Sequence, residues 1–296
     1  MPSTAHPNRP LILTKRDLVW VGRFDAMASP CEVLMAVESK ETAELFLRIA
    51  AHETWRIEQK FSRYRDDGII PRINNSGGAT IPVDAETAHL IDYAYQCHQL
   101  SDGLFDVTSG ILRKTWPFRP NSTIPTNKEV DALLPFIGLD KATWNNPDFR
   151  LPSDMQIDFG GIGKEYAVDR TLALLTAKTN SPIMVNYGGD ITCNRSPSPN
   201  TPWRVGIENS KEMIELTSGS LATSGSTHRY LMYDGKRYSH VLNPKTGWPI
   251  ENAPLSVTVK GDSCTHAGML ATFAMLKGKD AESFLEAQNV FYRILR

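Results

Sequence analysis

Apolar residues recur at helical spacing in two stretches of the first hundred residues. In the first, one side chain in every three or four is small or apolar, at Ala43, Phe46, Ala50, Thr54, Ile57 and Phe61. This period predicts a long amphipathic helix. In the second stretch, Asp84 is a favourable N-cap for a helix that buries Leu90, Ala94 and Cys97 and ends at residues 101–103.

The second half of the chain is richer in β-branched and aromatic runs. Ile183–Tyr187 has the pattern of a strand, and Asp234-Gly235 predicts a two-residue hairpin turn. Further strands are predicted at Trp203–Glu208, His228–Tyr233, Lys236–Leu242, Leu255–Lys260 and Asn289–Arg296, and helices at Cys264–Leu276 and Asp280–Gln288. Helices grouped early and hairpins grouped late predict an α+β fold, with mainly antiparallel sheets and flanking helices.

The remaining segments connect these elements. Residues 1–17 are polar and predict a flexible arm, so residues 18–296 are expected to form a single domain. Residues 61–78 contain Pro71 and the Gly77-Gly78 pair, which predict a loop. Residues 157–175 predict a short apolar run, a glycine turn and then a helix.

Composition narrows the class of protein. The 296 residues are 41% hydrophobic and 22% charged, and 32 Lys and Arg against 33 Asp and Glu leave a net charge of −1. This balance argues against a nucleic-acid or anionic-membrane binder. No apolar run is long enough to span a bilayer, no secretory signal is visible, and four widely spaced cysteines match neither a disulfide framework nor a zinc site. We therefore expect a cytoplasmic enzyme or small-molecule binder.

Three segments carry candidate chemistry, each with a plainer structural alternative. The turn Asp158–Lys164 offers glycines, a helix start and a lysine to a pyrophosphate, or it is simply a tight strand-to-helix connection. His240 lies at the end of a predicted strand, just before a turn. It is either a general base or a half-buried structural histidine of the strand. Thr265, Gly268 and Thr272 lie on one side of a helix start, where they cap it or ligate a cation, although this face offers no carboxylate.

Taken together, ten segments in order resemble the FAD:protein FMN transferase family, the ApbE-like flavin transferases. The segments are FDAMASPCEV, FSRYRDDGIIPRIN, SDGLFDVTSGIL, IDFGGIGKEYAVD, VNYGGDI, WRVGIENS, LATSGSTHRY, DGKRYSHVLNPKTGWPI, SVTVKGD and HAGMLATFAML. The resemblance covers residues 24 to 276, nearly the whole chain. It implies a T-fold-like α+β domain that uses a divalent cation, Mg²⁺ or alternatively Mn²⁺, to transfer FMN from FAD to a threonine or serine hydroxyl of a partner flavoprotein, releasing AMP.

The resemblance also implies roles for individual residues. His240 matches the catalytic base. The cofactor-binding positions are Met27, Tyr64, Leu104, Phe105 and Asp106 in the FAD pocket, Gly160, Lys164 and Tyr166 near the diphosphate, and Ser239 against the flavin. The metal-ligand positions are Gly163 through its carbonyl, Thr265, Gly268 and Thr272.

Several positions depart from the family pattern. Gly268 stands where the family has its anionic metal ligand, an aspartate, Asn243 replaces an aspartate near His240, and Glu165 replaces a glycine. Loss of the only metal-binding carboxylate predicts weak Mg²⁺ binding, unless His266, Asp262 or Glu165 compensates. Two alternatives to transfer therefore remain: a flavin carrier or regulator that binds FAD without efficient transfer, and an FAD pyrophosphatase that releases FMN and AMP.

Overall fold

The computed structural model describes residues 9–119, 122–198, 201–207, 212–227 and 229–296. By its internal contacts the chain divides into two compact units, each assembled from three chain segments. Unit 1 comprises Met1–Glu58, Gly163–Ala222 and Lys260–Ala267, and unit 2 comprises Gln59–Ile162, Thr223–Val259 and Gly268–Arg296. In the described part of the chain, no helix combines the length and the apolar character needed to cross a bilayer.

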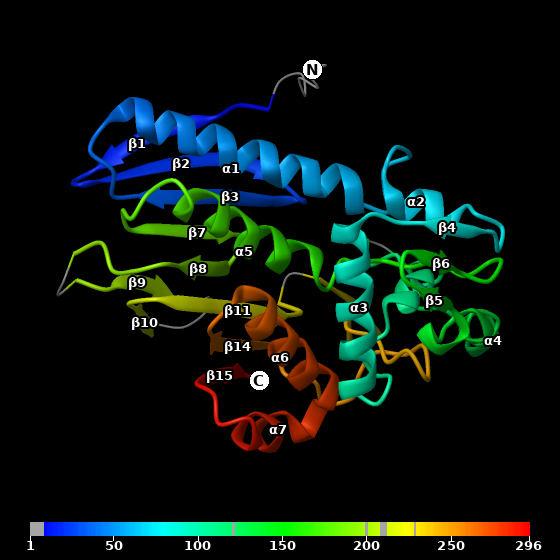
Figure 1. Cartoon of the computed structure of the whole chain (residues 1–296). Coiled ribbons are helices and arrows are strands. Elements are labelled where there is room, and N and C mark those ends of the chain that lie inside the picture. The colour runs from blue at the N-terminus through cyan, green and yellow to red at the C-terminus, as the bar shows by residue number, and fades with distance from the viewer. Residues whose placement is uncertain (1–8, 120–121, 199–200, 208–211, 228) are drawn as a thin grey trace. The chain divides into compact units, whose positions relative to one another are not determined.

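Unit 1 is built on an antiparallel sheet in the order β1-β2-β3-β7-β8-β11 (Figure 1). Its strands are β1 (Ile12–Arg16), β2 (Val19–Ala26), β3 (Ser29–Met35), β7 (Ile183–Tyr187), β8 (Asp190–Cys193) and the start of β11 (Gly219–Gly225). Helices α1 (Lys40–Phe61) and α5 (Gly163–Thr176) pack on one face. There Tyr187 joins both helices, because its hydroxyl lies 3.0 Å from the Thr54 hydroxyl and 2.9 Å from that of Thr171.

The other face of this sheet is covered in part by the hairpin β9 (Trp203–Gly206) and β10 (Met213–Leu216). Trp203, Ile214 and Leu216 of the hairpin are buried against Met184 and Ile191 of the sheet. Burial of these apolar side chains on both faces of the central strands stabilises unit 1.

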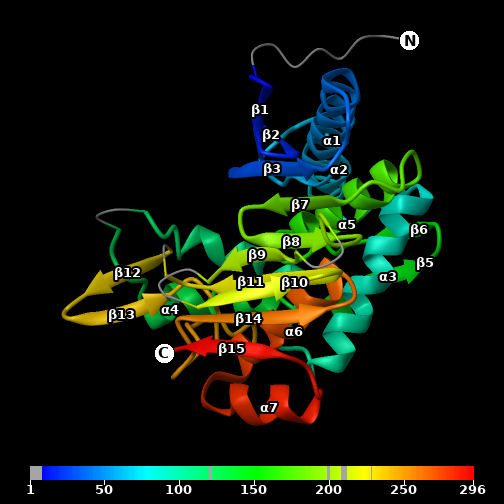
Figure 2. The same ribbon diagram turned by 90° about the vertical axis from the view of Figure 1, so that its left-hand side faces the viewer.

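Among the described residues, unit 2 contains two small antiparallel sheets, β4-β6-β5 and β12-β13, the antiparallel pair β14–β15 and most of the short helices (Figure 2). The strands are β4 (Thr80–Pro82), β5 (Thr143–Asn145), β6 (Asp148–Arg150), β12 (Tyr230–Tyr233), β13 (Lys236–Ser239), β14 (Ser256–Gly261) and β15 (Tyr292–Leu295). The helices are α2 (Ile69–Asn74), α3 (Ala85–Leu100), α4 (Asn127–Asp131), α6 (Cys264–Lys277), α7 (Ala281–Ala287) and 3₁₀ turns at Val107–Lys114, Leu134–Phe136, Leu139–Lys141 and Gly278–Asp280. Helix α6 begins in unit 1, and β14 ends there.

The predicted α+β fold is confirmed, and so are its principal helices. Helix α3 begins as expected, because Asp84 accepts a hydrogen bond from the Thr87 amide. The hairpin β12–β13 turns at Asp234-Gly235, both with positive φ. The strand predicted at His228–Tyr233 begins at Tyr230, and His228 lies outside the described residues.

Two predictions about the first eighty residues are wrong. Residues 12–16, which the polar sequence predicts to lie in a flexible arm, form β1, where backbone pairing with β2 outweighs their polar side chains. Residues 69–74, which Pro71 predicts to lie in a loop, form α2. Pro71 is tolerated in α2 because it occupies the first turn, whose N–H groups lack helical partners. The single domain over residues 18–296 stays a prediction.

Candidate functional site

In unit 2, His240 directly follows β13 and is held by one backbone carbonyl. Its amide donates to the Arg229 oxygen at 3.3 Å, and its ring Nδ1 lies 3.0 Å from the same oxygen. Because a carbonyl can only accept, Nδ1 carries the hydrogen and Nε2 keeps its lone pair. The ring packs edge-on against Phe118, with centroids 6.3 Å apart. This orientation presents Nε2 as the basic atom.

The surroundings of His240 keep its ring uncharged. Burial, followed by the positive charge of Arg229, lowers the pKa of His240 to about 4. Arg113 and Arg237 act in the same direction, and the hydrogen bond with the Arg229 carbonyl opposes them. At neutral pH the imidazole is therefore free to accept a proton.

Asn243, at a position where the resemblance implies an aspartate, makes hydrogen bonds within the turn that follows His240. Its Oδ1 accepts from the Lys245 amide at 2.9 Å, and its backbone oxygen accepts from the Gly247 amide at 2.7 Å. The turn is anchored to the core of unit 2, since the Trp116 indole donates to the Gly247 oxygen at 2.8 Å. The substitution therefore keeps a well-bonded turn.

Asp106 is buried and fully engaged in structural hydrogen bonds. Its Oδ1 accepts from the Thr108 amide and hydroxyl at 2.7 and 2.6 Å, which caps the following 3₁₀ turn. Its Oδ2 accepts from the Leu139 amide at 3.1 Å and lies 3.5 Å from His98 Nε2. Next to it, Phe105 is buried against Phe273, and Leu104 is half-buried.

Tyr64 and Gly160 belong to an arginine-rich part of unit 2. Tyr64 is 74% exposed, with the Arg63 guanidinium 5.8 Å from its ring centroid. Asp158 lies 3.4 Å from Arg63 and 3.9 Å from Arg113, and its Oδ1 accepts from the Gly160 amide at 2.8 Å. Because Arg63 and Arg113 share the one charge of Asp158, these three groups keep a net positive charge, which suits a phosphate-bearing ligand.

In unit 1, Met27 lies in a turn with an uncommon backbone. Met27 and Ala28 join β2 to β3 with φ values of 51° and 56°, a region that L residues other than Asn and Asp rarely adopt. The Met27 amide donates to Glu58 Oε1 at 2.7 Å. A two-residue hairpin turn requires positive φ at both positions, so this backbone is explained by the β2–β3 connection, and the FAD role of Met27 stays a prediction.

The start of α5 carries a buried ion pair. Lys164 Nζ lies 2.8 Å from Oδ2 of Asp190, which is 1% exposed and follows the Gly188-Gly189 turn. Burial opposes the charged form of Lys164, but the charge of Asp190 and their hydrogen bond outweigh it and raise the lysine pKa. Tyr166, two residues further along α5, is half-buried.

The start of α6 is fixed by Asp169 of α5. One carboxylate oxygen accepts from the Cys264 amide at 2.8 Å. The other accepts from the Thr265 amide at 2.8 Å and hydroxyl at 2.6 Å. Asp169 therefore caps α6 across the space between two helices and orients the Thr265 hydroxyl.

The predicted metal ligands do not by themselves form a site that fits Mg²⁺. Gly163, Thr265, Gly268 and Thr272 contribute neutral oxygens at most, and Thr272 Oγ1 lies 3.4 Å from Ser224 Oγ. Within the described ranges, no three His, Cys, Asp or Glu side chains are grouped so as to hold a metal ion. Mg²⁺ is usually held by at least one carboxylate, so a further ligand is needed.

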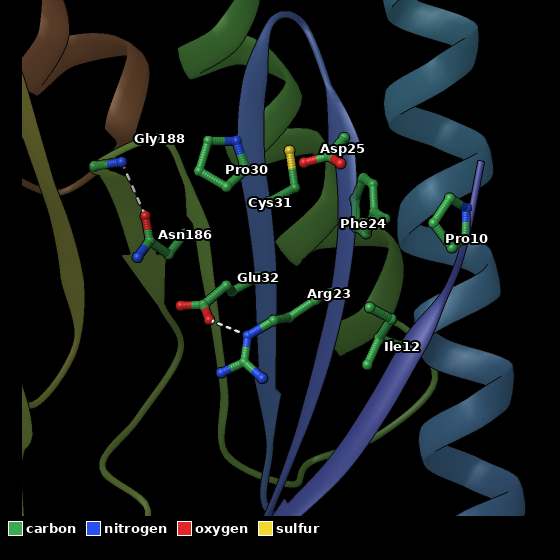
Figure 3. Close-up of a pocket in the computed structure, with 11 residues that line it drawn as sticks. Pro10, Ile12, Arg23, Phe24, Asp25, Pro30, Cys31, Glu32, Asn186 and Gly188 are labelled. Atoms are coloured by element: carbon green, nitrogen blue, oxygen red, sulfur yellow. Dashed lines mark hydrogen bonds and ion pairs between the residues drawn. The ribbon is translucent and has the colours of Figure 1, made fainter.

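Unit 1 also has a pocket of about 460 Å³ that the sequence did not predict (Figure 3). Arg23 and Glu32 lie side by side on β2 and β3, with the Arg23 Nε 2.6 Å from Glu32 Oε1. Cys31 also lines the pocket, and burial raises the pKa of its thiol to about 12. The paired charges and the protonated thiol leave these three residues without a reactive group at neutral pH.

Comparison with known proteins agrees with the resemblance seen in the sequence. A model of the ApbE family matches residues 27–294. The chain belongs to the ApbE family. It is 32% identical over 237 residues to the FAD:protein FMN transferase of Vibrio cholerae serotype O1, covering 76% of this chain and 71% of that protein. It is 29% identical over 261 residues to the enzyme of the same name from Escherichia coli K12, covering 82% and 74%.

Solved structures of ApbE proteins have the same fold. The ApbE protein of Thermotoga maritima superimposes with a TM-score of 0.85 at 29% identity, over 93% of this chain and 94% of that one. The flavinyl transferase ApbE of Pseudomonas stutzeri gives 0.84 at 26% identity, over 97% and 93%.

In this ApbE-family chain, two residues that shape the site have no signal in the sequence. The Arg229 carbonyl orients the ring of His240 and, after burial, the Arg229 charge lowers the His240 pKa, while Asp169 orients the Thr265 hydroxyl. Neither has a local signal, because Arg229 lies eleven residues from His240 and Asp169 ninety-six from Thr265.

Proposed function

We propose that this protein is an FAD:protein FMN transferase. In the reaction, the hydroxyl oxygen of a threonine or serine on a partner flavoprotein forms a bond to the phosphorus of the FMN half of FAD. The pyrophosphate P–O bond breaks, and AMP leaves with the bridging oxygen. The hydroxyl proton passes to His240 Nε2 and from there to solvent or to AMP, so atoms and charges balance.

The observation that carries the proposal is the orientation of the His240 ring. Nδ1 donates to the Arg229 carbonyl at 3.0 Å, which fixes Nε2 as the basic atom. Membership of a family whose named relatives are FAD:protein FMN transferases supports the same reaction. A neutral imidazole suits the role, because a hydroxyl is a poor nucleophile until a base removes its proton.

We assign the other residues as follows. In unit 2, Tyr64, Leu104, Phe105 and Asp106 line the flavin-nucleotide pocket, Gly160 lies at the diphosphate and Ser239 meets the flavin through its backbone. In unit 1, Met27, Lys164 and Tyr166 contact FAD. A divalent cation, when bound, neutralises charge on the phosphates. The acceptor is a flavoprotein with a threonine or serine flavinylation motif, and the cytoplasm remains the location we predict.

The test is transfer to a peptide. The protein is incubated with FAD, Mg²⁺ or Mn²⁺ and a peptide that carries an acceptor threonine, and the peptide mass and the released AMP are measured. We expect FMN on the peptide and an equal amount of AMP, and no product with an alanine in place of the threonine. Free FMN with AMP would indicate a pyrophosphatase, and bound but intact FAD would indicate a carrier; either result overturns the proposal.

A further inference from the structure

The hairpin β12–β13 of unit 2 carries a group of exposed apolar side chains. Tyr230, Met232 and Tyr233 are all open to solvent, so three of the four residues of β12 are large, apolar and exposed. Among the described residues no third strand pairs with the hairpin, which forms a two-stranded ribbon of its own (Figure 2). Single exposed apolar residues are ordinary on a protein surface, whereas a contiguous group of them marks an interaction site.

The hairpin is already anchored by its opposite face. Leu231 is buried in the core that contains Trp116, and Tyr238, its neighbour across the hairpin, packs on the same core. Because side chains alternate between the two faces of a strand, Tyr230 and Met232 lie on the face opposite Leu231. The exposed face is therefore not needed to hold the hairpin in unit 2.

Arg237 fixes the position of Tyr230 on the exposed face. Its guanidinium carbon lies 4.3 Å from the centroid of the Tyr230 ring. Its nitrogens donate to the hydroxyl and the carbonyl oxygen of Ser226, at 3.2 and 2.5 Å. These partners are neutral, so the contacts do not neutralise the charge of Arg237, which lies opposite Met232 in the hairpin. A held aromatic ring beside a held cation is a surface prepared for binding before a partner arrives.

The hairpin is also positively charged. Residues 229–239 contain three basic residues and one acidic residue, namely Arg229, Lys236, Arg237 and Asp234. A surface that combines apolar and basic side chains complements a partner that combines apolar side chains with carboxylates. The exposed apolar residues and the two basic residues of β13 are together called the hairpin surface: Tyr230, Met232, Tyr233, Lys236 and Arg237.

This surface begins next to His240. Tyr230 lies opposite Ser239, the residue before His240, and follows Arg229, whose carbonyl orients the His240 ring. Met232 is two residues further along β12, roughly 7 Å beyond Tyr230 at the usual rise of a strand. An extended chain that presents a hydroxyl to Nε2 of His240 therefore reaches both side chains with the few residues beside that hydroxyl.

We propose that the hairpin surface is where the acceptor flavoprotein docks. The segment that carries the acceptor threonine or serine lies along the hairpin, with apolar side chains against Tyr230 and Met232 and carboxylates against Lys236 and Arg237. The inference rests on the proposed function, which requires a protein substrate at His240. It adds the surface that selects this substrate, so that affinity for the acceptor comes from the hairpin and the proton transfer from the base.

The test compares two synthetic peptides as FMN acceptors for the full-length protein, with FAD and Mn²⁺. The first peptide has one threonine with a leucine and an aspartate within four residues on each side. The second has glycine in place of each leucine and asparagine in place of each aspartate. We expect KM to be about tenfold lower for the first peptide, as for a side chain that anchors an interface. The kcat values should be similar, because both peptides present the same hydroxyl.

Met232→Ser should raise the KM of the first peptide about tenfold and leave kcat and FAD affinity unchanged. Lys236→Gln should raise KM chiefly at low ionic strength, because salt screens exposed charges. Both side chains are exposed, so the variants should fold. Met213→Ser is the matched control, since Met213 is 56% exposed against 57% for Met232 and lies on the other hairpin, β9–β10. Equal KM values for the two peptides, or for the two methionine variants, overturn the inference.

A peptide that cannot react separates this inference from the proposed function. The first peptide, with alanine for threonine and a terminal fluorophore, should bind the wild type in an anisotropy titration and bind Met232→Ser about tenfold more weakly. If it does and no threonine peptide is flavinylated, the proposed function fails and the docking surface stands. If peptides are flavinylated and Met232→Ser behaves as the wild type, only the docking surface fails. A dimer in sedimentation that Met232→Ser dissociates would assign the surface to a second copy of this chain and would also overturn the inference.

Discussion

The ring of His240 shows how one backbone contact defines a reactive atom. Its Nδ1 lies 3.0 Å from the Arg229 carbonyl oxygen, so Nε2 is the ring atom left with a lone pair, and this orientation comes from a backbone group. In many sites a carboxylate performs this orientation and also makes the imidazole more basic. Here the carbonyl supplies the orientation, and the nearby arginines make the imidazole less basic.

Replacing His240 by alanine should slow transfer by about 10²–10⁴-fold, the usual contribution of a general base. FAD affinity should change little, because a base for the acceptor hydroxyl need not contact bound FAD. Single-turnover transfer to a threonine peptide, with FAD titrated separately, measures both. His89→Ala, at an exposed position on α3, is the control and should behave as the wild type. Equal rates for His240→Ala would remove His240 from the mechanism.

The low pKa of His240 predicts an unusual pH profile. A base with a pKa of about 4 is lost only as the pH falls through that value, so transfer should stay active well below pH 6.5. Arg229→Gln keeps the backbone carbonyl but removes one charge that lowers the pKa, so the acidic limb should move upward. A limb at the same pH in both proteins would contradict this account.

The low pKa of folded His240 also makes the free energy of unfolding depend on pH. In the unfolded chain His240 titrates near 6.5, so between pH 6.5 and 4 the unfolded state binds protons that the folded state refuses. The contribution of His240 therefore lowers folding stability as the pH falls through this window. Chemical denaturation of wild type and His240→Ala at pH 7 and pH 5 should show a smaller loss for the variant.

The sequence predicted individual site residues unevenly. The place of His240 between a strand and a turn leaves two alternatives open, a base or a structural histidine, and the family resemblance is what favours the base. The roles of Arg229 and Asp169 depend on pairings across eleven and ninety-six residues, which no local pattern encodes. The FAD roles of Asp106 and Gly160 stay predictions, and the structure adds that both take part in local hydrogen bonds.

At the scale of elements, strong local sequence signals predicted helices and strands correctly. Helix α3 has an N-cap, a regular apolar face and a clear end, and its observed bounds follow them. The prediction is wrong at strand β1 because its residues are mostly exposed and only backbone pairing with β2 defines the strand. The loop prediction is wrong at α2 because Pro71 indicates a helix break, whereas the neighbouring Ile70 and Ile73 are buried in a helix whose first turn contains the proline.

Replacing Asp84 by alanine should lower the free energy of unfolding by about 1 kcal/mol, the usual value of an N-cap. The cap is the hydrogen bond from the Thr87 amide, at 3.0 Å. Asp84 also lies 2.7 Å from Lys60, so Asp84→Asn is the matched control: it keeps a capping oxygen and loses the ion pair. Urea denaturation should give the asparagine variant a free energy of unfolding close to that of the wild type. A loss as large as that of alanine would assign the effect to the ion pair.

At the scale of the whole molecule, the α+β class followed from the order of elements, but the division into two units did not. Each unit draws on three segments, and helix α1 begins in one unit and ends in the other. Boundaries of this kind depend on contacts between distant segments. Composition and turn signals, which mark linkers, do not detect them.

The protein as a whole should bind FAD in preference to FMN. The assigned residues include Gly160 and Tyr166 for the diphosphate, which FMN lacks. Isothermal calorimetry of FAD and FMN under the same conditions measures the difference. Equal or tighter binding of FMN would mean that the protein gains no affinity from the AMP half of FAD, which contradicts this prediction.

The burial of all four cysteines makes the chain a convenient host for a single chemical label. Cys31, Cys97, Cys193 and Cys264 are free and buried, and burial raises the pKa of each thiol, to about 11 for Cys97 and about 12 for Cys31 and Cys193. Thiols in this state react slowly with maleimides. A cysteine introduced at Leu18, which is 83% exposed, would therefore take up a fluorophore almost alone. Its anisotropy could then report the capture of an acceptor protein without any change to the native thiols.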